Sequence, residues 1–588
     1  GSIFLGVKAR LKERGDSVPW YDWLLAGGGL LVGLYVTVMY PTIAYRLGVL
    51  TPDRWILGGL AILLILEATR RIAGWGLVWC AVPCILYAKF AYLLPGLLYA
   101  KGSSWERIAS YLYLDASGIL GLPLNVAASV IVAFIFFGRA LYAVGGDKFL
   151  TDVALKMMGR YRGGAAKVSV VSSSLFGTVS GSAVANVAVD GAITIPMMKR
   201  TGYPPHVAAA IEAVASNGGQ IMPPVMGAAA FLIAEFLNIS YGEVALAAAI
   251  PALLYYLALF TQVDLEAAKH GLVGLPTEQI PQFRTMMRRG WVFVIPLSIL
   301  IYTLMIANWE PGKAGMVAVI ATFLVGALQK ETRPTFRAIL TSIEETGQTL
   351  LDIIVVTALA GLVIGSLQLS GLTFKLSLLL VTVTGGNVLF LLALTAVVCI
   401  LLGMSLPTTV VYITLAVLVG PALTQLGIVP LAAHLFLFYF GMLSLITPPD
   451  CLATYTAAAI ARSNFWQTGW TGMRLGIAAY IVPFVFAVHP ALILKGTAEE
   501  ILVAIGTATV GVILLGVGCA GYLFRPLGWG KRGILWLASL LLLLPSWSGV
   551  WLMIDGVGLG LGLILILWEW HRGATRNAPI AQANISGP

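Results

Sequence analysis

The chain has 588 residues, of which 59% are hydrophobic and 11% are charged, against about 25% charged residues in an ordinary soluble domain. This composition excludes a soluble globular enzyme, a disordered chain and a fibrous protein. It indicates an all-α polytopic membrane protein, because apolar runs long enough to span a bilayer recur along the chain. A span and its loop take roughly 30–40 residues, so we expect about 14–17 membrane segments.

The net charge is +10. In a soluble domain this charge would suggest a nucleic-acid partner, but in a membrane protein Lys and Arg gather in cytoplasmic loops. We therefore expect a lipid bilayer and no nucleic acid as a partner. The first apolar run follows Lys8, Arg10, Lys12 and Arg14, which predicts an uncleaved, cytoplasmic N-terminus. The cysteines lie in apolar runs, which favours packing over metal binding.

Two regions of the apolar pattern are broken, at 165–199 and 388–424. The C-terminal stretch 533–570 is long enough for two spans. Two connecting segments, 148–162 and 333–348, look amphipathic and are expected at the membrane interface. The remaining predicted apolar segments are 22–40, 55–70, 75–94, 118–143, 206–236, 242–262, 290–308, 314–329, 349–369, 430–461, 472–489 and 499–523.

An internal repeat emerges when the chain is aligned with itself so that Ser180 meets Ser405. No gap is needed between 180–224 and 405–449, and most shared residues are Pro or Gly. Threading both broken regions as re-entrant hairpins puts most Lys and Arg on one side of the membrane and starts the two repeats from opposite sides. The units, about 146–236 and 371–461, are therefore expected to form an inverted-topology repeat, as in secondary carriers.

Each repeat contains a polar hairpin tip and a double-proline break inside an apolar segment. The tips are GTVSGSAVAN (177–186) and GMSLPTT (403–409), and the breaks are SNGGQIMPP (216–224) and LSLITPP (443–449). Non-helical backbone within a bilayer is tolerated where protein or a water-filled cavity satisfies it. Freed carbonyls and Ser, Thr or Asn oxygens suit Na⁺, and half-helix N-termini suit a carboxylate. One such cluster would usually indicate close packing; two matched clusters favour transport.

Asp190, Glu212 and His434 are ionisable residues near these features. An ionisable residue at membrane depth suggests function. Asp190 lies midway along the return arm of the first hairpin and is a candidate to line a water-filled cavity. Glu212 and His434 lie near the start of their spans, which favours a structural role in a polar seam and leaves a functional one open. There is no Walker motif, so ATP is not expected to power the chain directly. The histidines are scattered without ligand spacing, which argues against a membrane-embedded enzyme. A non-transporting receptor or assembly scaffold is a third class.

At these residues the chain resembles the membrane component of a TRAP transporter (tripartite ATP-independent periplasmic transporter), and more closely the fused permeases of the TAXI-type branch. The stretches 159–236 and 434–461 carry the resemblance. It implies scaffold helices like those of the small Q subunit over 1–113, a large M-like subunit over 114–496, and extra membrane helices of unknown role over 497–588.

The resemblance also implies an elevator-type symporter of the bacterial cytoplasmic (inner) membrane. A transport domain holding both hairpins would move through a fixed scaffold, as a monomeric membrane unit. Na⁺ would be the coupling ion, and a periplasmic TAXI-type binding protein would deliver a small organic anion, a dicarboxylate or a glutamate-like acid. The alternative is a stand-alone Na⁺- or H⁺-coupled organic-anion carrier without a binding protein.

Carried to this sequence, the resemblance implies two Na⁺ sites and a substrate site, with no catalytic residue. The first Na⁺ site would use Gly177, Ser180, Ser182, Asn186, Asn217, Gly218 and Gly219. The second would use Gly403, Ser405, Thr408, Thr409, Thr447 and Pro448. The substrate carboxylate would meet Ser182, Asn186, Thr408, Pro223 and Pro449.

Overall fold

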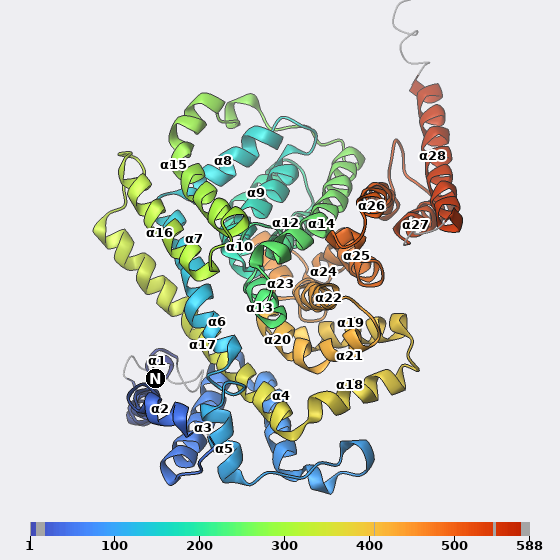
Figure 1. Ribbon diagram of the computed structural model, residues 1–588. Coiled ribbons are helices and arrows are strands. Elements are labelled where there is room, and N and C mark those ends of the chain that lie inside the picture. The colour runs from blue at the N-terminus through green and yellow to red at the C-terminus, as the bar shows by residue number, and fades with distance from the viewer. Residues whose placement is uncertain (1, 8–17, 47, 405, 545–548, 578–588) are drawn as a thin grey trace, which may run out of the picture. The chain divides into compact units, whose positions relative to one another are not determined.

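The computed structural model describes the chain except for residues 1, 8–17, 47, 405, 545–548 and 578–588 (Figure 1). The described residues form helices and contain no β-strand, apart from one isolated bridge between Tyr522 and Pro526. Nine of the described helices are long and apolar enough to cross a membrane, and several shorter apolar helices accompany them. The protein is therefore an all-α polytopic membrane protein.

The chain divides into two compact units. Unit 1 comprises 1–144, 231–241 and 295–441, and unit 2 comprises 145–230, 242–294 and 442–588. These boundaries differ from the functional division at residues 113 and 497, which stays a prediction.

Unit 1 contains the N-terminal helices, the helices between residues 311 and 370, and the second hairpin. Its helices are α1 (Ser2–Gly6), α2 (Trp20–Tyr45), α3 (Pro52–Ala73), α4 (Trp75–Phe90), α5 (Trp105–Leu114), α6 (Leu122–Val126), α7 (Val132–Ala143), α16 (Pro311–Ala327), α17 (Phe336–Ser370), α18 (Leu372–Val383), α19 (Val388–Gly403), α20 (Thr408–Leu418), α21 (Gly420–Gln425) and most of α22 (Pro430–Leu443). Most of α13 (Ala228–Leu237) and the end of α15 (Phe283–Ile301) also belong to it.

Unit 2 contains the first hairpin and the C-terminal helices. Its helices are α8 (Gly146–Met158), α9 (Gly164–Ser180), α10 (Ala183–Val189), α11 (Gly191–Arg200), α12 (Pro205–Gly218), α14 (Tyr241–Lys269), α23 (Leu452–Ala461), α24 (Phe465–Leu475), α25 (Ile477–Val488), α26 (Ala498–Ala520), α27 (Trp529–Leu543) and α28 (Gly549–Asn577). Short 3-10 or π turns also occur: η4 (Gly219–Ile221) in unit 2, and η3 (Ala127–Ile131) and η6 (Tyr302–Ile306) in unit 1.

The N-terminal helices of unit 1 are joined by close backbone contact and a buried ion pair. An ideal Cβ on Gly58 of α3 would lie 2.3 Å from the main-chain oxygen of Ala109 in α5, so only glycine permits this approach. Arg71 of α3 pairs with Asp22 of α2 at 2.6 Å, and both side chains are buried. Burying a charge is costly unless it is paired, so this pair fixes α2 against α3.

The repeat found in the sequence is also a repeat of structure. Helix α12 spans Pro205–Gly218 and α22 spans Pro430–Leu443, and these bounds coincide in the gap-free register of the sequence repeat. Helices α10 and α20 begin at Ala183 and Thr408, which correspond in the same register. The peptide bonds Pro223–Pro224 and Pro448–Pro449 are both cis. The two broken regions therefore have one local architecture, a hairpin followed by an interrupted helix.

Two segments differ from the sequence prediction. The expected boundary between an interfacial helix at 333–348 and a span at 349–369 is absent, because α17 runs unbroken from Phe336 to Ser370. The sequence from Phe336 to Ser370 holds no proline, and Gly347 by itself does not end a helix. Conversely, the predicted span 472–489 is divided at Gly476 into α24 and α25.

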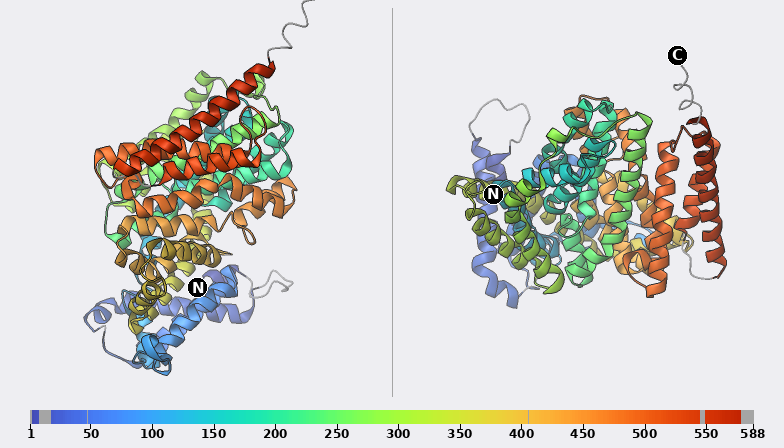
Figure 2. Two further views of the ribbon diagram at one scale, coloured as in Figure 1. Left: turned by 90° about the vertical axis from the view of Figure 1, so that its right-hand side faces the viewer. Right: turned by 90° about the horizontal axis from the view of Figure 1, so that it is seen from above.

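The predicted pair of C-terminal spans corresponds to α27 and α28. These helices pack side by side with α26, as the orange and red ribbons of Figure 2 show. Leu514 of α26, Leu542 of α27 and Leu565 of α28 share one buried apolar cluster. Arg525 before α27 and Lys531 in its first turn both pair with Glu569 of α28, which ties the start of α27 to α28.

Candidate functional site

The tip of the first hairpin is a two-residue turn between α9 and α10. Helix α9 ends at Ser180, and Gly181 follows with a left-handed φ of 63°. Ser182 caps α10, its Oγ accepting from the main-chain N–H of Ala185 at 3.4 Å. A left-handed residue followed by an N-cap is a standard way to end one helix and start the next, so the sequence GS specifies the turn locally.

This hairpin touches the break after α12 through bare backbone. An ideal Cβ on Gly177 would lie 2.2 Å from the Cα of Gly219, and one on Gly219 would lie 2.3 Å from the Cα of Gly177. An ideal Cβ on Gly218 would lie 2.3 Å from the ring of Tyr255. The structure therefore brings together Gly177 with Gly218 and Gly219, which the sequence assigned to one site. Figure 1 shows α9, α10 and α12 as neighbours.

Polar atoms without a hydrogen-bond partner gather on these elements. The side-chain atoms Ser180 Oγ, Asn186 Oδ1 and Asn217 Nδ2 are buried and have no partner in the described part of the chain. Asn186 is held by its amide nitrogen, which donates to the main-chain oxygen of Ser173 at 2.9 Å. Buried polar groups are normally paired. Ser180 Oγ and Asn186 Oδ1 are oxygen atoms of the kind that Na⁺ prefers as ligands. Asn217 differs from them, because its Oδ1 accepts from Gln220 at 3.1 Å and its unpartnered atom is a nitrogen.

The residues of the second predicted Na⁺ site are divided between the two units. In unit 1, Gly403 ends α19 and Thr408 begins α20. The Oγ1 of Thr408 is buried without a partner in the described chain, whereas Thr409 is half-buried. Ser405 lies outside the described residues. Within unit 1, Thr408 is the counterpart of the unpartnered groups of the first tip.

In unit 2, Thr447 is already engaged. Its Oγ1 donates to the main-chain oxygen of Leu443 at 2.6 Å and lies 2.6 Å from the hydroxyl of Tyr480. Pro448 packs against Gly469 of α24, where an ideal Cβ would lie 2.6 Å from the proline ring. The Thr447 hydroxyl is therefore occupied by protein contacts, unlike those of Ser180 and Thr408.

The predicted substrate residues are distributed in the same way. Ser182 and Pro449 are exposed, Pro223 is half-buried and Asn186 is buried, all within unit 2. Thr408 is buried in unit 1. Their common role in substrate binding stays a prediction.

The sequence named Asp190 and Glu212 singly, but the structure joins them in one buried cluster with hydroxyl groups. Ser173 Oγ lies 2.7 Å from Asp190 Oδ2 and 2.8 Å from Glu212 Oε1. Both carboxyl groups are fully buried. The other hydrogen-bonding groups of the cluster are Ser169, Ser172, Thr194 and Ser216.

Sequence reasoning missed these hydroxyl residues, although a signal was present. Ser169, Ser172 and Ser173 follow the spacing that places residues on one helix face, and Glu212 and Ser216 are four residues apart. A polar stripe on α9 that matches a polar pair on α12 would have indicated a shared seam.

His434 takes a structural place in unit 1. Its Nδ1 lies 2.7 Å from the hydroxyl of Tyr412, and both side chains are buried. The ring of Phe236, on α13, lies 6.2 Å from each of the two rings. This pairing anchors α13 to α20 and α22. Among the described residues, no group of His, Cys, Asp and Glu side chains could hold a metal ion.

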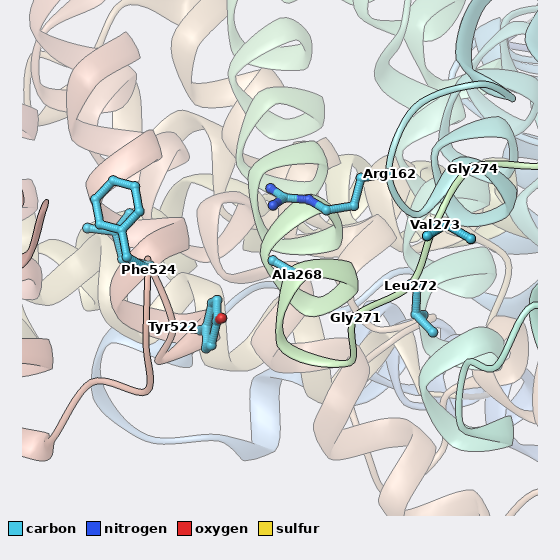
Figure 3. Close-up of a pocket in the computed structure, with 9 residues that line it drawn as sticks. Arg162, Ala268, Gly271, Leu272, Val273, Gly274, Tyr522 and Phe524 are labelled. Atoms are coloured by element: carbon cyan, nitrogen blue, oxygen red, sulfur yellow. The ribbon is translucent and has the colours of Figure 1, made fainter. Parts of the chain in front are cut away.

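A cavity of about 520 Å³ lies at the other end of α9 (Figure 3). Arg162 and Gly274 line it together with Tyr522 and Phe524 from the turn after α26. Arg162 precedes α9 and Ser180 ends it, so α9, at 1.5 Å per residue, separates cavity and tip by about 25 Å. None of the predicted site residues lines this cavity.

Three comparisons place the chain among known proteins. The sequence model of the family described as "Tripartite ATP-independent periplasmic transporter, DctM component" matches residues 60–501. The chain is 23% identical to the sialic acid TRAP transporter large permease protein SiaM of Vibrio cholerae, over 71% of this chain and 96% of that protein. It is 25% identical to the C4-dicarboxylate TRAP transporter large permease protein DctM of Pseudomonas aeruginosa, over 59% and 78%.

A further relative is the 2,3-diketo-L-gulonate TRAP transporter large permease protein YiaN of Escherichia coli, at 24% identity over 65% of this chain and 86% of that protein. Among solved structures, the YdaH transporter of Alcanivorax borkumensis is similar with a TM-score of 0.46 and 17% identity, over 75% of this chain and 97% of that one.

Proposed function

Because this chain belongs to the DctM component family of tripartite ATP-independent periplasmic transporters, we propose that it imports a small organic anion together with Na⁺. Permeases of this family work with a periplasmic substrate-binding protein and are not enzymes. We propose that the binding protein here is of the TAXI type. The chain would be a multi-pass protein of the bacterial inner membrane with a cytoplasmic N-terminus.

The relatives support an organic acid as the cargo. Sialic acid, a C4-dicarboxylate and 2,3-diketo-L-gulonate are named for three of them, and all three carry a carboxylate. We propose a dicarboxylate or a glutamate-like acid for this chain. The exposed Ser182 hydroxyl at the first tip is a group that a carboxylate can reach.

The observation that carries the Na⁺ assignment is the set of unpartnered oxygens at the first tip. Ser180 Oγ, in the last turn of α9 with Gly177, and Asn186 Oδ1, on α10, are buried acceptors without a partner among the described residues. Leaving a buried polar group unpaired costs about 1–3 kcal/mol. A bound Na⁺ would supply the missing partner. At the second tip, Thr408 Oγ1 is a buried hydroxyl oxygen without a partner among the described residues.

The test is uptake of a radiolabelled acid into proteoliposomes. Glutamate and a C4 dicarboxylate are offered with and without an inward Na⁺ gradient, and with and without a TAXI-type binding protein of the same genome. Uptake that needs both the gradient and the binding protein supports the proposal. Uptake with the gradient alone would instead establish the stand-alone carrier. Binding of acids to the isolated binding protein is measured first, so that the offered acid is one it holds.

We also propose that transport proceeds by an elevator movement. Interrupted helices and hairpins allow polar groups to cross the bilayer inside a rigid body. Pairs of cysteines, one in the proposed transport domain and one in the proposed scaffold, should crosslink with a yield that depends on substrate. Crosslinking yields that do not change with Na⁺, substrate or binding protein would argue for a fixed hairpin.

A further inference from the structure

The cavity at the start of α9 is built from parts of unit 2 that lie far apart in the sequence. Arg162, which precedes α9, and Ala268, in the last turn of α14, line it. The loop 271–274 and the turn 522–524 complete its wall. Its volume of about 520 Å³ lies within the range of about 300–1,000 Å³ that small-ligand sites occupy. The family match ends at residue 501, so the turn 522–524 adds a wall from outside the matched region.

This cavity lies beside the ends of two helices that pack side by side. An ideal Cβ on Gly516 of α26 would lie 3.3 Å from the main-chain oxygen of Ala258 in α14. Leu265, in the last turns of α14, and Ala520, the last residue of α26, belong to one buried cluster. Helices α14 and α26 therefore end on the same side of the membrane, and the cavity is on that side.

Stacked tryptophan and arginine side chains mark the same end of α26. The Cζ of Arg532 lies 4.3 Å from the ring centre of Trp529 and 5.4 Å from that of Trp536. An ideal Cβ on Gly521, the residue before Tyr522, would lie 3.3 Å from this Cζ. Tryptophan gathers at the membrane–water interface, where basic side chains also anchor helix ends. The turn that lines the cavity is therefore at the depth of the lipid headgroups.

The charges beside the cavity include more cations than anions. Asp264 of α14 pairs with both Arg162 and Lys167, and one carboxylate neutralises only one of these cations. The side chain of Lys167 is 8% exposed and that of Arg162 is 50% exposed. In Figure 3 the guanidinium of Arg162 points across the end of α14 toward the turn that carries Tyr522 and Phe524. Arg162 therefore presents the excess charge to the cavity.

Two further carboxylates show the same ratio of charges. Glu266 of α14 lies 3.3 Å from Arg474 and 3.7 Å from Lys269. Glu569 of α28 also pairs with two basic residues, one of which directly follows the turn 522–524. Each of the three carboxylates thus has two Lys or Arg partners. A bound anion would offset part of this excess, most directly at the half-exposed Arg162.

The apolar part of the wall distinguishes an amphiphile from a free anion. Val273 is 77% exposed and Phe524 is 49% exposed, and both line the cavity. A free phosphate would use only the basic groups and would leave these side chains uncovered. A phospholipid can place its phosphate at Arg162 and its acyl chains against Phe524. Basic pockets between membrane helices on the cytoplasmic side bind anionic headgroups, and the bias of Lys and Arg assigns this end of α14 to the expected cytoplasmic side.

We propose that this cavity binds the headgroup of an anionic phospholipid. Its phosphate contacts Arg162, and its acyl chains lie against Phe524 at the end of α26. The extra C-terminal helices then have a role, because their turn 522–524 supplies one wall of the lipid site. This proposal goes beyond the proposed function and does not depend on which acid or coupling ion the protein carries.

Native mass spectrometry of the purified full-length protein measures the bound lipid directly. The protein in detergent is titrated with phosphatidylglycerol or with phosphatidylcholine of the same acyl chains. Phosphatidylglycerol should bind about tenfold more tightly, since hydrogen bonds between ionised groups add about that much. Equal affinity for the two lipids would overturn the proposal. Glycerol 3-phosphate carries a phosphate without acyl chains. If it displaces the lipid at equal concentration, the cavity holds a soluble anion and the lipid assignment is wrong.

Two variants test whether the lipid occupies this cavity. Arg162→Gln removes the half-exposed charge and leaves Lys167 paired with Asp264, so the fold should be kept. Ala268→Leu fills the cavity without changing any charge. Each should weaken phosphatidylglycerol binding about tenfold.

Arg288→Gln is the matched control, because Arg288 is exposed on the same expected side and does not line the cavity. Its affinity for phosphatidylglycerol should equal that of the wild type. Thermal unfolding of each variant shows that the protein compared is folded. Wild-type affinity in either folded cavity variant would overturn the assignment of the lipid to this cavity.

Discussion

Gly177 and Gly219 touch through their main chains, so that a side chain on either would collide with the other. The ideal Cβ positions lie 2.2 and 2.3 Å from the partner's Cα. The contact joins the last turn of α9 to the break after α12, and the unpartnered Ser180 hydroxyl belongs to the same turn. The hairpin tip and the break can therefore approach this closely only because neither Gly177 nor Gly219 carries a side chain.

Gly177→Ala or Gly219→Ala should therefore separate tip and break. Overpacking of this kind typically lowers the free energy of unfolding by about 1–3 kcal/mol. Na⁺-dependent uptake should be lost even in variant protein that remains folded, because the displaced tip and break no longer hold the proposed Na⁺ ligands together. Uptake and thermal unfolding of the purified variants measure both effects. Gly506→Ala in α26 is the matched control, since a Cβ there meets nothing within 4 Å. Uptake by Gly177→Ala equal to that of Gly506→Ala would contradict the prediction.

The sequence predicted the hairpins and breaks because their determinants are local. Proline and glycine punctuate both repeats in one register, and the structure ends α12 and α22 at corresponding residues, Gly218 and Leu443. A helix interrupted by Pro-Pro needs no distant partner to be interrupted. The resemblance assigned Gly177 and Gly219 to one Na⁺ site. The structure places their main chains in contact, and the Na⁺ site itself stays a prediction.

The polar stripe on α9 signals a seam, but the sequence does not specify which carboxyl groups meet there, because that depends on how three helices pack. Asp190 follows α10, Glu212 lies on α12 and Ser173 on α9. The meeting of Asp190 with Glu212 is therefore a property of the fold. The unbroken α17 escaped prediction for a different reason. Its first half is amphipathic and its second half is apolar, so composition suggested a boundary where the backbone has none.

Ser180→Ala should weaken the response of uptake to Na⁺. Loss of a ligand oxygen to a charged group costs about 1.5–3 kcal/mol, so the Na⁺ concentration for half-maximal uptake should rise about tenfold or more. Folding should be unaffected, since Ser180 Oγ has no partner to lose among the described residues. The control is Ser174→Ala on the same helix, whose Oγ donates to the Val171 carbonyl at 2.8 Å. An unchanged Na⁺ response would remove Ser180 from the cation site.

Thr408→Val tests the second tip in the same way. The Thr408 hydroxyl is buried without a partner in the described chain, and valine keeps the shape of threonine while removing the oxygen. The half-maximal Na⁺ concentration should rise about tenfold if about 1.4 kcal/mol of binding is lost. Thr424→Val is the control, because Thr424 Oγ1 donates to the Pro421 carbonyl at 3.0 Å. If both variants respond to Na⁺ like the wild type, the second tip holds no cation through this side chain.

The last prediction uses the second repeat as a template for the first. Asp190→Leu alone should destabilise the protein, because Ser172 and Ser173 lose an acceptor and buried groups left unpaired cost about 1–3 kcal/mol each. In the gap-free register, the residues that correspond to Asp190, Thr194, Glu212 and Ser216 are Leu415, Val419, Leu437 and Gly441. The combined variant Asp190→Leu, Thr194→Val, Glu212→Leu and Ser216→Ala also carries Ser169→Ala, Ser172→Ala and Ser173→Ala, so that no hydroxyl of the cluster is left without its acceptor. Replacing a whole buried ionic cluster by apolar residues is often neutral or stabilising by about 1–4 kcal/mol. Alanine replaces Ser216, in place of the glycine found at 441, to keep helix propensity.

The combined variant should therefore unfold at a higher temperature than Asp190→Leu, although it carries more substitutions. Thermal unfolding in detergent, read by intrinsic tryptophan fluorescence, compares the two variants directly. A combined variant less stable than the single one would mean that the cluster holds the first repeat together. The architecture of the first repeat would then depend on the cluster.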